Sequence, residues 1–461
     1  PWLAVTTWTP PPDSGGEVWR ERRVNSMKYH KPLLLGVLLA LLLGSLAASA
    51  ADATGGRGQA SLSLDHAVAM ALAGNPGLAA IEARARALEE LPAQKGTLPD
   101  PQLLFNLMNL PVDTFSFSQE AMTQVQIGIS QMLPYPGKLA LQEEVATLEA
   151  SAADDKVAEM RLRLVRDVRT LWWTLYYLDR ALEVVASNQE LLRQFVTIAQ
   201  TKYKVGKGLQ QDVLLAQVEL SKLLDREIAL QGMRRIMAAR LNALLDRQVD
   251  TVVRLVRQVD ESLPELARDG MLYQAAEDSR PLLRQQSRQI EAARLRRDLA
   301  KKDYYPDFRV GALYGFRSGE NPNGSSRADF ATFMFSMNLP IYAGSRQDRK
   351  LDQRNSELSR ERYTFSDLRS RVAAEIATAL ADYQRARQQA SLFREGIIPQ
   401  ATQTVASMRA GYQVNKVDFL NLVRAQITLF NYQVQYWKAL SEANQARARV
   451  TAAVGKETVY E

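Results

Sequence analysis

Hydrophobic and polar residues alternate with a period of two in four short segments of the chain. In one of them, Val125, Ile127 and Ile129 alternate with glutamine, glycine and serine. Such alternation predicts a β-strand with one apolar face and one polar face. The loop that links the two strands of each pair is polar. We therefore expect strands at about residues 102–109, 122–133, 307–316 and 328–340.

Two long stretches have the composition of continuous helices. Residues 138–205 contain neither proline nor glycine and are rich in strong helix formers. At about 1.5 Å per residue, this helix would be roughly 100 Å long, so it must pack along other helices. A second long helix starts at Arg346, and Gly396 and Pro399 predict a kink or a change of register within it. Each is followed by a turn and another helix, which predicts helical hairpins at residues 138–246 and 346–454.

The order of these elements and several short motifs occur twice in the chain. The matching segments follow one another in the same order, about 205–209 residues apart. Such self-similarity indicates a tandem duplication, with a first structural repeat at residues 51–260 and a second at residues 261–461. The matching segments are 98–101 with 305–307, 132–138 with 338–344, 203–207 with 412–416, and 216–218 with 425–427.

The beginning of the chain has the features of an export signal. An apolar stretch at residues 33–46 follows Lys28 and Lys31 and precedes an Ala-Ser-Ala motif. This is the pattern of a secretory signal peptide. A membrane anchor is the alternative, but so short a stretch spans a bilayer poorly. We assign the signal peptide to residues 27–50 and interpret residues 1–26 as an upstream leader or an artefact.

Four strands per chain are too few to close a transmembrane barrel, which has at least about eight. An open sheet edge cannot face lipid, because its backbone groups would lack hydrogen-bond partners. Several subunits could share one barrel, with the Phe, Ile and Val face toward lipid and the polar face toward a wet lumen. The alternative is the edge of a soluble sandwich.

Composition argues against several functional classes. The chain has 58 Lys and Arg residues against 51 Asp and Glu residues, and both signs are interspersed, so we expect no nucleic-acid partner. It has no cysteine and only two histidines, which excludes thiolate metal sites, thiol catalysis and disulfides. It lacks the motifs H-E-x-x-H, G-x-S-x-G and G-x-x-x-x-G-K-[ST]. We therefore expect no enzyme activity, no cofactor and no metal site.

As an ordered set, the motifs resemble those of the TolC-like outer-membrane efflux duct family. The resemblance extends from about Leu62 to Val454 and includes the Leu-Pro-Asp-Pro and Ile-Ser-Gln motifs, the Tyr-x-Val turns and the Ala-Gln pairs. It implies a homotrimer in outer-membrane lipid. The expected fold is mainly α with a small β part: tandem-duplicated long helical hairpins plus four strands. Together, three chains would complete a transmembrane β-barrel of twelve strands and a periplasmic α-helical barrel.

The resemblance also implies partners and a passive transport function. A periplasmic adaptor protein and an inner-membrane pump would deliver substrates to the channel, which does no chemistry itself. The Asn-Leu-Pro-Val-Asp stretch at residues 109–113 and the Pro-Gly-Lys motif resemble the heavy-metal-efflux branch, which implies heavy-metal cations as cargo. The alternatives are a periplasmic coiled-coil adaptor or scaffold protein without its own pore, and a secreted enzyme or structural rod.

The turns at residues 203–212 and 412–421 match the tunnel tips of the family, where adaptors dock. Family members often carry acidic gate residues just after these turns. Asp212 fits this pattern, whereas Asn421 and Arg424 stand where some members have aspartate. We hypothesise that an Asp212–Arg424 salt bridge, within or between subunits, holds the tip shut; the alternative is that Asp212 merely starts a helix. The docking candidates are Tyr203, Val205, Gly206, Lys207, Tyr412, Val414, Asn415 and Lys416.

Overall fold

A computed structural model describes residues 61–456, and the expected leader and signal peptide lie outside the described residues. The first repeat contains α1 (Leu64–Gly74), α2 (Pro76–Glu89), α3 (Leu91–Gly96), β1 (Gln102–Met108), β2 (Gln124–Leu133), α4 (Lys138–Lys204) and α5 (Gln210–Leu244). The second contains α6 (Asp269–Ser279), α7 (Pro281–Lys302), β3 (Phe308–Phe316), β4 (Phe330–Met337), α8 (Gln347–Ser391), the π-helix η1 (Leu392–Ile397), α9 (Ile398–Gln413) and α10 (Phe419–Val454).

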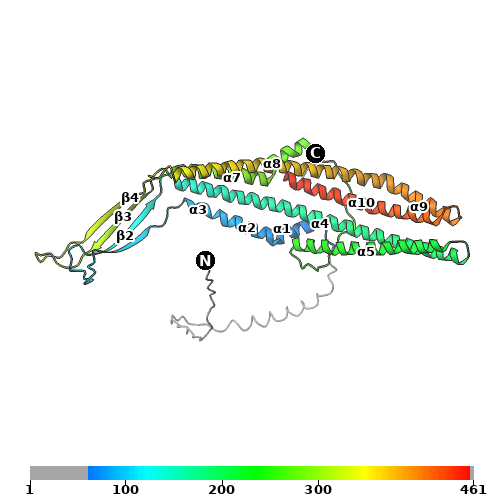
Figure 1. The fold of residues 1–461 in the computed structure, drawn as a ribbon, viewed down its shortest axis with the longest axis horizontal. Helices are drawn as coiled ribbons and strands as arrows, with labels where there is room; N and C mark the ends of the chain where they lie inside the picture. Colours follow the sequence, from blue (N-terminus) through cyan, green and yellow to red (C-terminus); the bar gives the residue numbers. More distant parts are fainter. Residues whose placement is uncertain (1–60, 457–461) are drawn as a thin grey trace, which may run out of the picture. The chain divides into compact units, whose positions relative to one another are not determined.

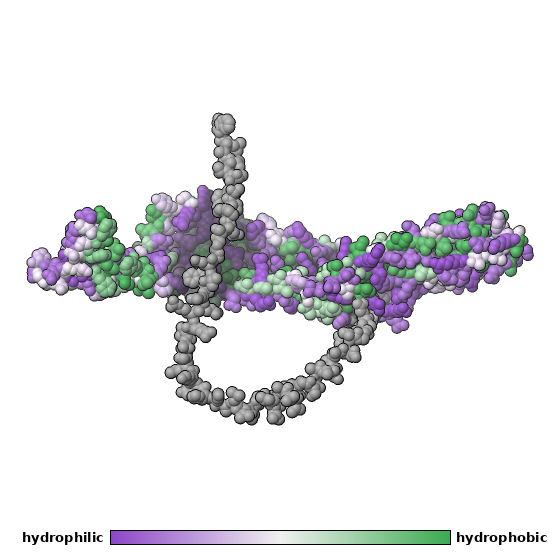
Figure 2. All heavy atoms as spheres, turned by 90° about the horizontal axis from the view of Figure 1, so that it is seen from below, coloured by the Kyte–Doolittle hydropathy of each residue, from purple (hydrophilic) through white to green (hydrophobic). Residues whose placement is uncertain are grey.

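The four strands form one antiparallel sheet in the order β1-β2-β3-β4. Phe105 lies opposite Ile127, and Ile127 lies opposite Tyr314, so alternate residues of successive strands share one apolar face. Because side chains alternate between the two faces of a strand, this face is continuous across the sheet. Figure 2 shows apolar side chains gathered at the sheet end of the molecule.

The long helices lie side by side, with the sheet at one end and both interhelical turns at the other (Figure 1). Helix α4, of 67 residues, packs against α5, α7 and α10. Its middle section buries Trp172, Trp173 and Tyr176, and the indole N–H of Trp172 donates to the Leu62 carbonyl at 3.1 Å. Among residues 61–456, no helix is both long enough and apolar enough to cross a membrane. The predicted fold class, duplicated long hairpins with a small sheet, is confirmed.

Two departures from regular helix mark the repeats. Each repeat begins with a broken helix, because Asn75 and Arg280 both adopt an extended conformation (φ −67°, ψ 116°) before a proline at the start of the next helix. The Asn75 side chain accepts from Leu78 N at 3.0 Å and so caps α2. The predicted change of register near Gly396 and Pro399 appears as the π-helix η1, in which one turn carries an extra residue.

The two repeats are joined by an ionic cluster where strands give way to helices. Lys138, the first residue of α4, donates to the two carboxylate oxygens of Asp307 at 2.9 and 3.0 Å. Asp303 lies 3.3 Å from the same ammonium group. The Asp307 carboxylate also accepts from Tyr135 N at 2.7 Å. A basic residue at the start of one repeat's long helix is thus held by the carboxylate that precedes the other repeat's strand.

Candidate functional site at the interhelical turns

The two turns between the long helices have the same backbone structure. Gly206 and Asn415 occupy the left-handed region, with φ of 71° and 58°, a conformation common where helices end. In the first turn, Lys207 N donates to Lys202 O at 2.8 Å, and in the second, Lys416 N donates to Gly411 O at 2.9 Å. These bonds satisfy carbonyls that would otherwise be free at the helix ends. The duplication therefore extends to the hydrogen bonds of the turns.

One side chain joins the two turns. Lys202, in the last turn of α4, donates to Tyr412 O at 2.9 Å and to Asn415 Oδ1 at 2.8 Å. Its ammonium group also lies 3.8 Å from the centroid of the Tyr412 ring. The positive charge thus sits at the carbonyl ends of both α4 and α9, where the helix dipoles favour a cation. Lys202 is the most direct polar link between the hairpins at this end of the described chain.

Beneath this link lies a small hydrophobic core. The Tyr412 and Phe419 rings are 5.3 Å apart, and the Phe195 and Phe419 rings are 6.2 Å apart. These residues pack with others from α4, α5 and α10, so the two hairpins share one core near the turns. Tyr412 is 7% exposed, and its hydroxyl has no hydrogen-bond partner within the described chain. Burial and the nearby Asp212 carboxylate raise the pKa of Tyr412.

The predicted docking residues divide into exposed and buried positions. Tyr412 is buried, whereas its counterpart Tyr203 is 48% exposed. The equivalent tyrosines thus have different environments, because only Tyr412 is covered by the neighbouring hairpin of its own chain. The remaining docking candidates, Val205, Gly206, Lys207, Val414, Asn415 and Lys416, are exposed.

The predicted gate residues do not form a pair within the chain. Among the ion pairs of residues 61–456, none joins Asp212 to Arg424. Asp212 is half-buried, while Asn421 and Arg424 are exposed. Burial raises the pKa of Asp212, and the Asp418 carboxylate also raises it, whereas a backbone hydrogen bond and Lys202 lower it. Within residues 61–456, the structure therefore does not contain the intra-subunit form of the predicted salt bridge.

The sequence interpretation missed two residues of this site. Lys202 stands where the second repeat has Gly411, and Asp418 stands where the first repeat has Leu209. Comparing the repeats position by position would have singled out both as places where the duplication is broken. Asp418 was also detectable as the polar residue immediately before the apolar start of α10.

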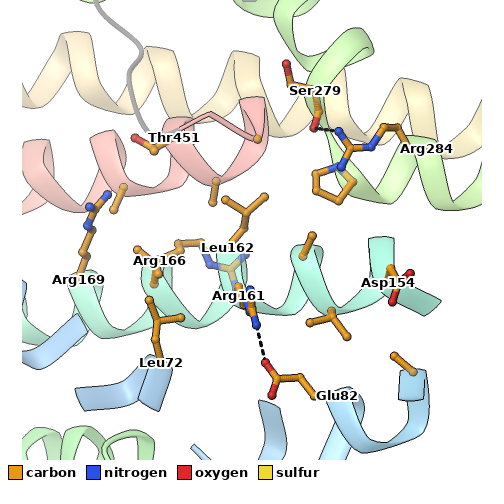
Figure 3. Close-up of a pocket in the computed structure, with 18 of the residues that line it drawn as sticks. Leu72, Glu82, Asp154, Arg161, Leu162, Arg166, Arg169, Ser279, Arg284 and Thr451 are labelled. Atoms are coloured by element: carbon orange, nitrogen blue, oxygen red, sulfur yellow. Dashed lines mark hydrogen bonds and ion pairs between the residues drawn. The ribbon is translucent and has the colours of Figure 1, made fainter. Parts of the chain in front are cut away.

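A recess of about 900 Å³ lies far from the turns, between α4, α2 and the adjoining ends of α7 and α10. Figure 3 shows that arginines line it and that two of them, Arg161 and Arg284, contact neighbouring residues. Arg161 lies 2.7 Å from Glu82, and Arg284 donates to Ser279 O at 3.4 Å and to Asp155 at 3.2 Å. Because Arg284 of the second repeat bonds to Asp155 of the first, we assign the recess to packing between the repeats. Nowhere in residues 61–456 do three or more metal-ligating His, Cys, Asp or Glu side chains gather.

Comparison with known proteins identifies the class to which this two-repeat architecture belongs. Residues 67–247 and 272–456 match the family described as Outer membrane efflux protein, one segment in each repeat. The chain belongs to this family. It is an efflux channel component of the outer membrane, and the members of this class are channels rather than enzymes.

Curated and solved proteins agree with this assignment. The cobalt-zinc-cadmium resistance protein CzcC of Cupriavidus metallidurans is 20% identical over 399 residues, which cover 86% of this chain and 90% of that protein. The outer-membrane channel OprN has a TM-score of 0.72 and 18% identity, covering 85% of this chain and 89% of OprN. The outer membrane protein VceC of Vibrio cholerae has a TM-score of 0.71 and 18% identity, covering 85% of this chain and 96% of VceC. At 18% identity, the similarity to OprN and VceC shows a shared fold.

Proposed function

We propose that the channel is the outer-membrane part of a three-component efflux system and acts as a homotrimer. In this proposal, a periplasmic adaptor docks on the interhelical turns and an inner-membrane pump supplies cargo and free energy. The observation that carries the proposal is the pair of equivalent turns at the end of the helices opposite the apolar sheet (Figure 1). With the sheet in the outer membrane, the turns extend into the periplasm and present Tyr203, Val205 and Val414 to a partner.

The tip would close through contacts between subunits. Asp212 is half-buried beside Asp418, and its pKa is raised. The raised pKa indicates that neighbouring groups of the same chain do not fully stabilise the charged carboxylate against burial. Arg424 is exposed and has no ion-pair partner within residues 61–456. A trimer would bring the Arg424 of one subunit toward the Asp212 of the next. This is the inter-subunit form of the predicted salt bridge, and Asn421 would lie beside it.

Single-channel recording in planar bilayers tests this closure. We expect small, mostly closed currents from the wild-type protein and a several-fold higher open probability for Asp212→Ala and for Arg424→Ala. The double variant is expected to match the single variants, because residues that act as one pair are not additive. Asp225→Ala, which removes an exposed carboxylate from the same helix α5, is the control and should behave as wild type. Additive effects, or currents unchanged in both single variants, would contradict the proposed pair.

We further propose that the cargo is divalent heavy-metal cations. The support is the similarity to a cobalt-zinc-cadmium resistance protein along 90% of its length. We expect deletion of the gene to lower the tolerated concentrations of zinc, cobalt and cadmium several-fold, and expression of the wild-type protein to restore them. Tolerance of hydrophobic drugs should stay unchanged. Loss of drug tolerance with unchanged metal tolerance would show that the cargo belongs to another class.

A further inference from the structure

Aromatic side chains gather where the apolar face of the sheet meets the long helices. Phe308 of β3 and Phe335 of β4 stack on this face, with ring centroids 5.9 Å apart. Just beyond the strands, the rings of Tyr135 and Tyr305 stack with centroids 4.5 Å apart. Tyrosine suits a boundary between lipid and water, because its ring is apolar and its hydroxyl is polar. With the sheet in the outer membrane, this boundary faces the periplasm.

A lysine without a carboxylate partner lies beside this tyrosine stack. Lys302, at the end of α7, places its ammonium group 5.5 Å from the centroid of the Tyr135 ring. An ammonium group has three N–H donors. Within residues 61–456, no carboxylate pairs with this group and no oxygen accepts a hydrogen bond from it. Lys302 can therefore bind an anion that approaches along the apolar face.

The acidic side chains around Lys302 pair with other cations. Asp303, the next residue in the chain, lies 3.3 Å from the ammonium group of Lys138. Lys301, the preceding residue, lies 2.9 Å from Asp298. Carboxylates are thus present at this end of the helices, but the charge of Lys302 lies at the aromatic stack instead.

We propose that Lys302, Tyr135 and Tyr305 bind the headgroup phosphate of an anionic phospholipid at the periplasmic surface of the outer membrane. The ammonium group pairs with the phosphate, and the acyl chains extend along the face that carries Phe308 and Phe335. A cation without a carboxylate partner favours a headgroup of net negative charge over a zwitterionic headgroup, which carries a cation of its own. The inference rests on the proposed placement of the sheet in the outer membrane and names a lipid for its boundary.

The duplication provides a comparison within the chain. Leu98 and Tyr305 are equivalent positions, and Lys95 and Lys302 each stand three residues before them. Lys95 is exposed and has no ion-pair partner in residues 61–456. The position equivalent to Tyr135 is Ile341, so the first repeat's lysine has no equivalent tyrosine pair. We therefore expect Lys95 to contribute little to headgroup binding.

Lipid binding to the detergent-solubilised protein tests the site. Native mass spectrometry counts the lipids bound when short-chain phosphatidylglycerol or phosphatidylcholine is added. We expect wild type to bind phosphatidylglycerol several-fold more tightly than phosphatidylcholine, and Lys302→Met to lose most of this preference. Binding of phosphatidylcholine should change little, which shows that the variant is folded. Tyr305→Leu, which copies the first repeat, should reduce the preference by a smaller factor.

Two variants separate this site from a general effect of positive charge. Lys301→Met removes the same net charge from the neighbouring residue, whose ammonium group already pairs with Asp298, and should bind lipid as wild type does. Lys95→Met removes an unpaired cation away from the tyrosine stack and should keep most of the preference. Equal losses in Lys301→Met and Lys302→Met would show that net charge alone attracts the lipid. An unchanged preference in Lys302→Met would refute the site.

Inorganic phosphate distinguishes a lipid site from a site for free phosphate. Excess inorganic phosphate should displace phosphatidylglycerol only weakly, because it has no acyl chains to lie along the apolar face. Complete displacement would show that these residues bind free phosphate and would overturn the assignment to a lipid.

Planar-bilayer recordings separate the lipid site from the channel function. Binding of phosphatidylglycerol through Lys302 by a protein that conducts no current would refute the channel and leave the lipid site intact. Normal currents without binding that depends on Lys302 would refute the lipid site alone.

Discussion

Replacing Arg280 by methionine is expected to lower the free energy of unfolding by about 3–5 kcal/mol. Arg280, at the break between α6 and α7, is 3% exposed by side chain, and its partner Glu159 on α4 is 5% exposed. Two parallel hydrogen bonds of 2.9 Å join the guanidinium group to the two carboxylate oxygens. Without Arg280, the one ion-pair partner left to the buried Glu159 within residues 61–456 would be Arg163, which is half-exposed. The cost is therefore that of a poorly compensated buried charge.

Removing both partners of the pair provides the matched control for this prediction. Neither charge is then left buried without the other. The double variant Arg280→Met with Glu159→Leu should therefore lie within about 1 kcal/mol of wild type, because replacing both partners leaves no buried charge. Arg369→Met, at an exposed ion pair with Glu277, should cost less than about 1 kcal/mol.

Denaturant unfolding of the detergent-solubilised protein measures all of these variants. A double variant as unstable as the single one would show that packing, and not the stranded charge, sets the cost. A single variant no less stable than Arg369→Met would show that the buried pair contributes little.

Replacing Lys202 by methionine is expected to raise the open probability of the channel about tenfold. Methionine retains an unbranched apolar chain but removes the ammonium group that bonds to Tyr412 O and Asn415 Oδ1. A hydrogen bond to a charged group contributes about 1.5–3 kcal/mol, and about 1.4 kcal/mol corresponds to tenfold in an equilibrium. If opening separates the two hairpins at the tip, this link exists only in the closed state, and its loss favours opening.

Two variants distinguish this link from general effects of charge and packing at the tip. Lys204→Met removes an exposed positive charge two residues away and should leave the currents as in wild type. Tyr412→Phe retains the ring and the carbonyl that Lys202 contacts, removes a buried hydroxyl without a partner, and should not open the channel. Planar-bilayer recordings of all three variants make the comparison. Equal gains from Lys202→Met and Lys204→Met would assign the effect to net charge and reject a specific link.

Several features of the fold were predictable because they depend on neighbouring residues. Alternation along β2 identifies a strand by its own side chains, and the absence of proline and glycine in residues 138–205 identifies a helix. The irregularity near Gly396 was likewise visible locally, and the structure shows it as a π-helix. The helix starts after Asn75 and Arg280 were visible in the same way, because each is followed by a proline, which favours the first turn of a helix.

The candidate site was predictable in position but not in its contacts. The repeated Tyr-x-Val motifs located both turns, since each turn is specified by its own few residues. The link through Lys202 joins residues 210 positions apart in the chain, and no pattern along the sequence signals such a partner. The difference between buried Tyr412 and exposed Tyr203 also escaped prediction, because the two motifs look alike.

By itself, the sequence determined the four strands, the long helices, the turns and the duplication, because each is written in local periodicity or in motifs that recur at one spacing. Only the tertiary structure decided which charges meet. It paired Lys138 with Asp307 and Arg280 with Glu159, left Asp212 apart from Arg424, and placed Lys202 between the two turns. The physical reason is that ionic contacts depend on the distance between atoms of separate helices, which is set by how whole helices pack and not by the order of residues within either one.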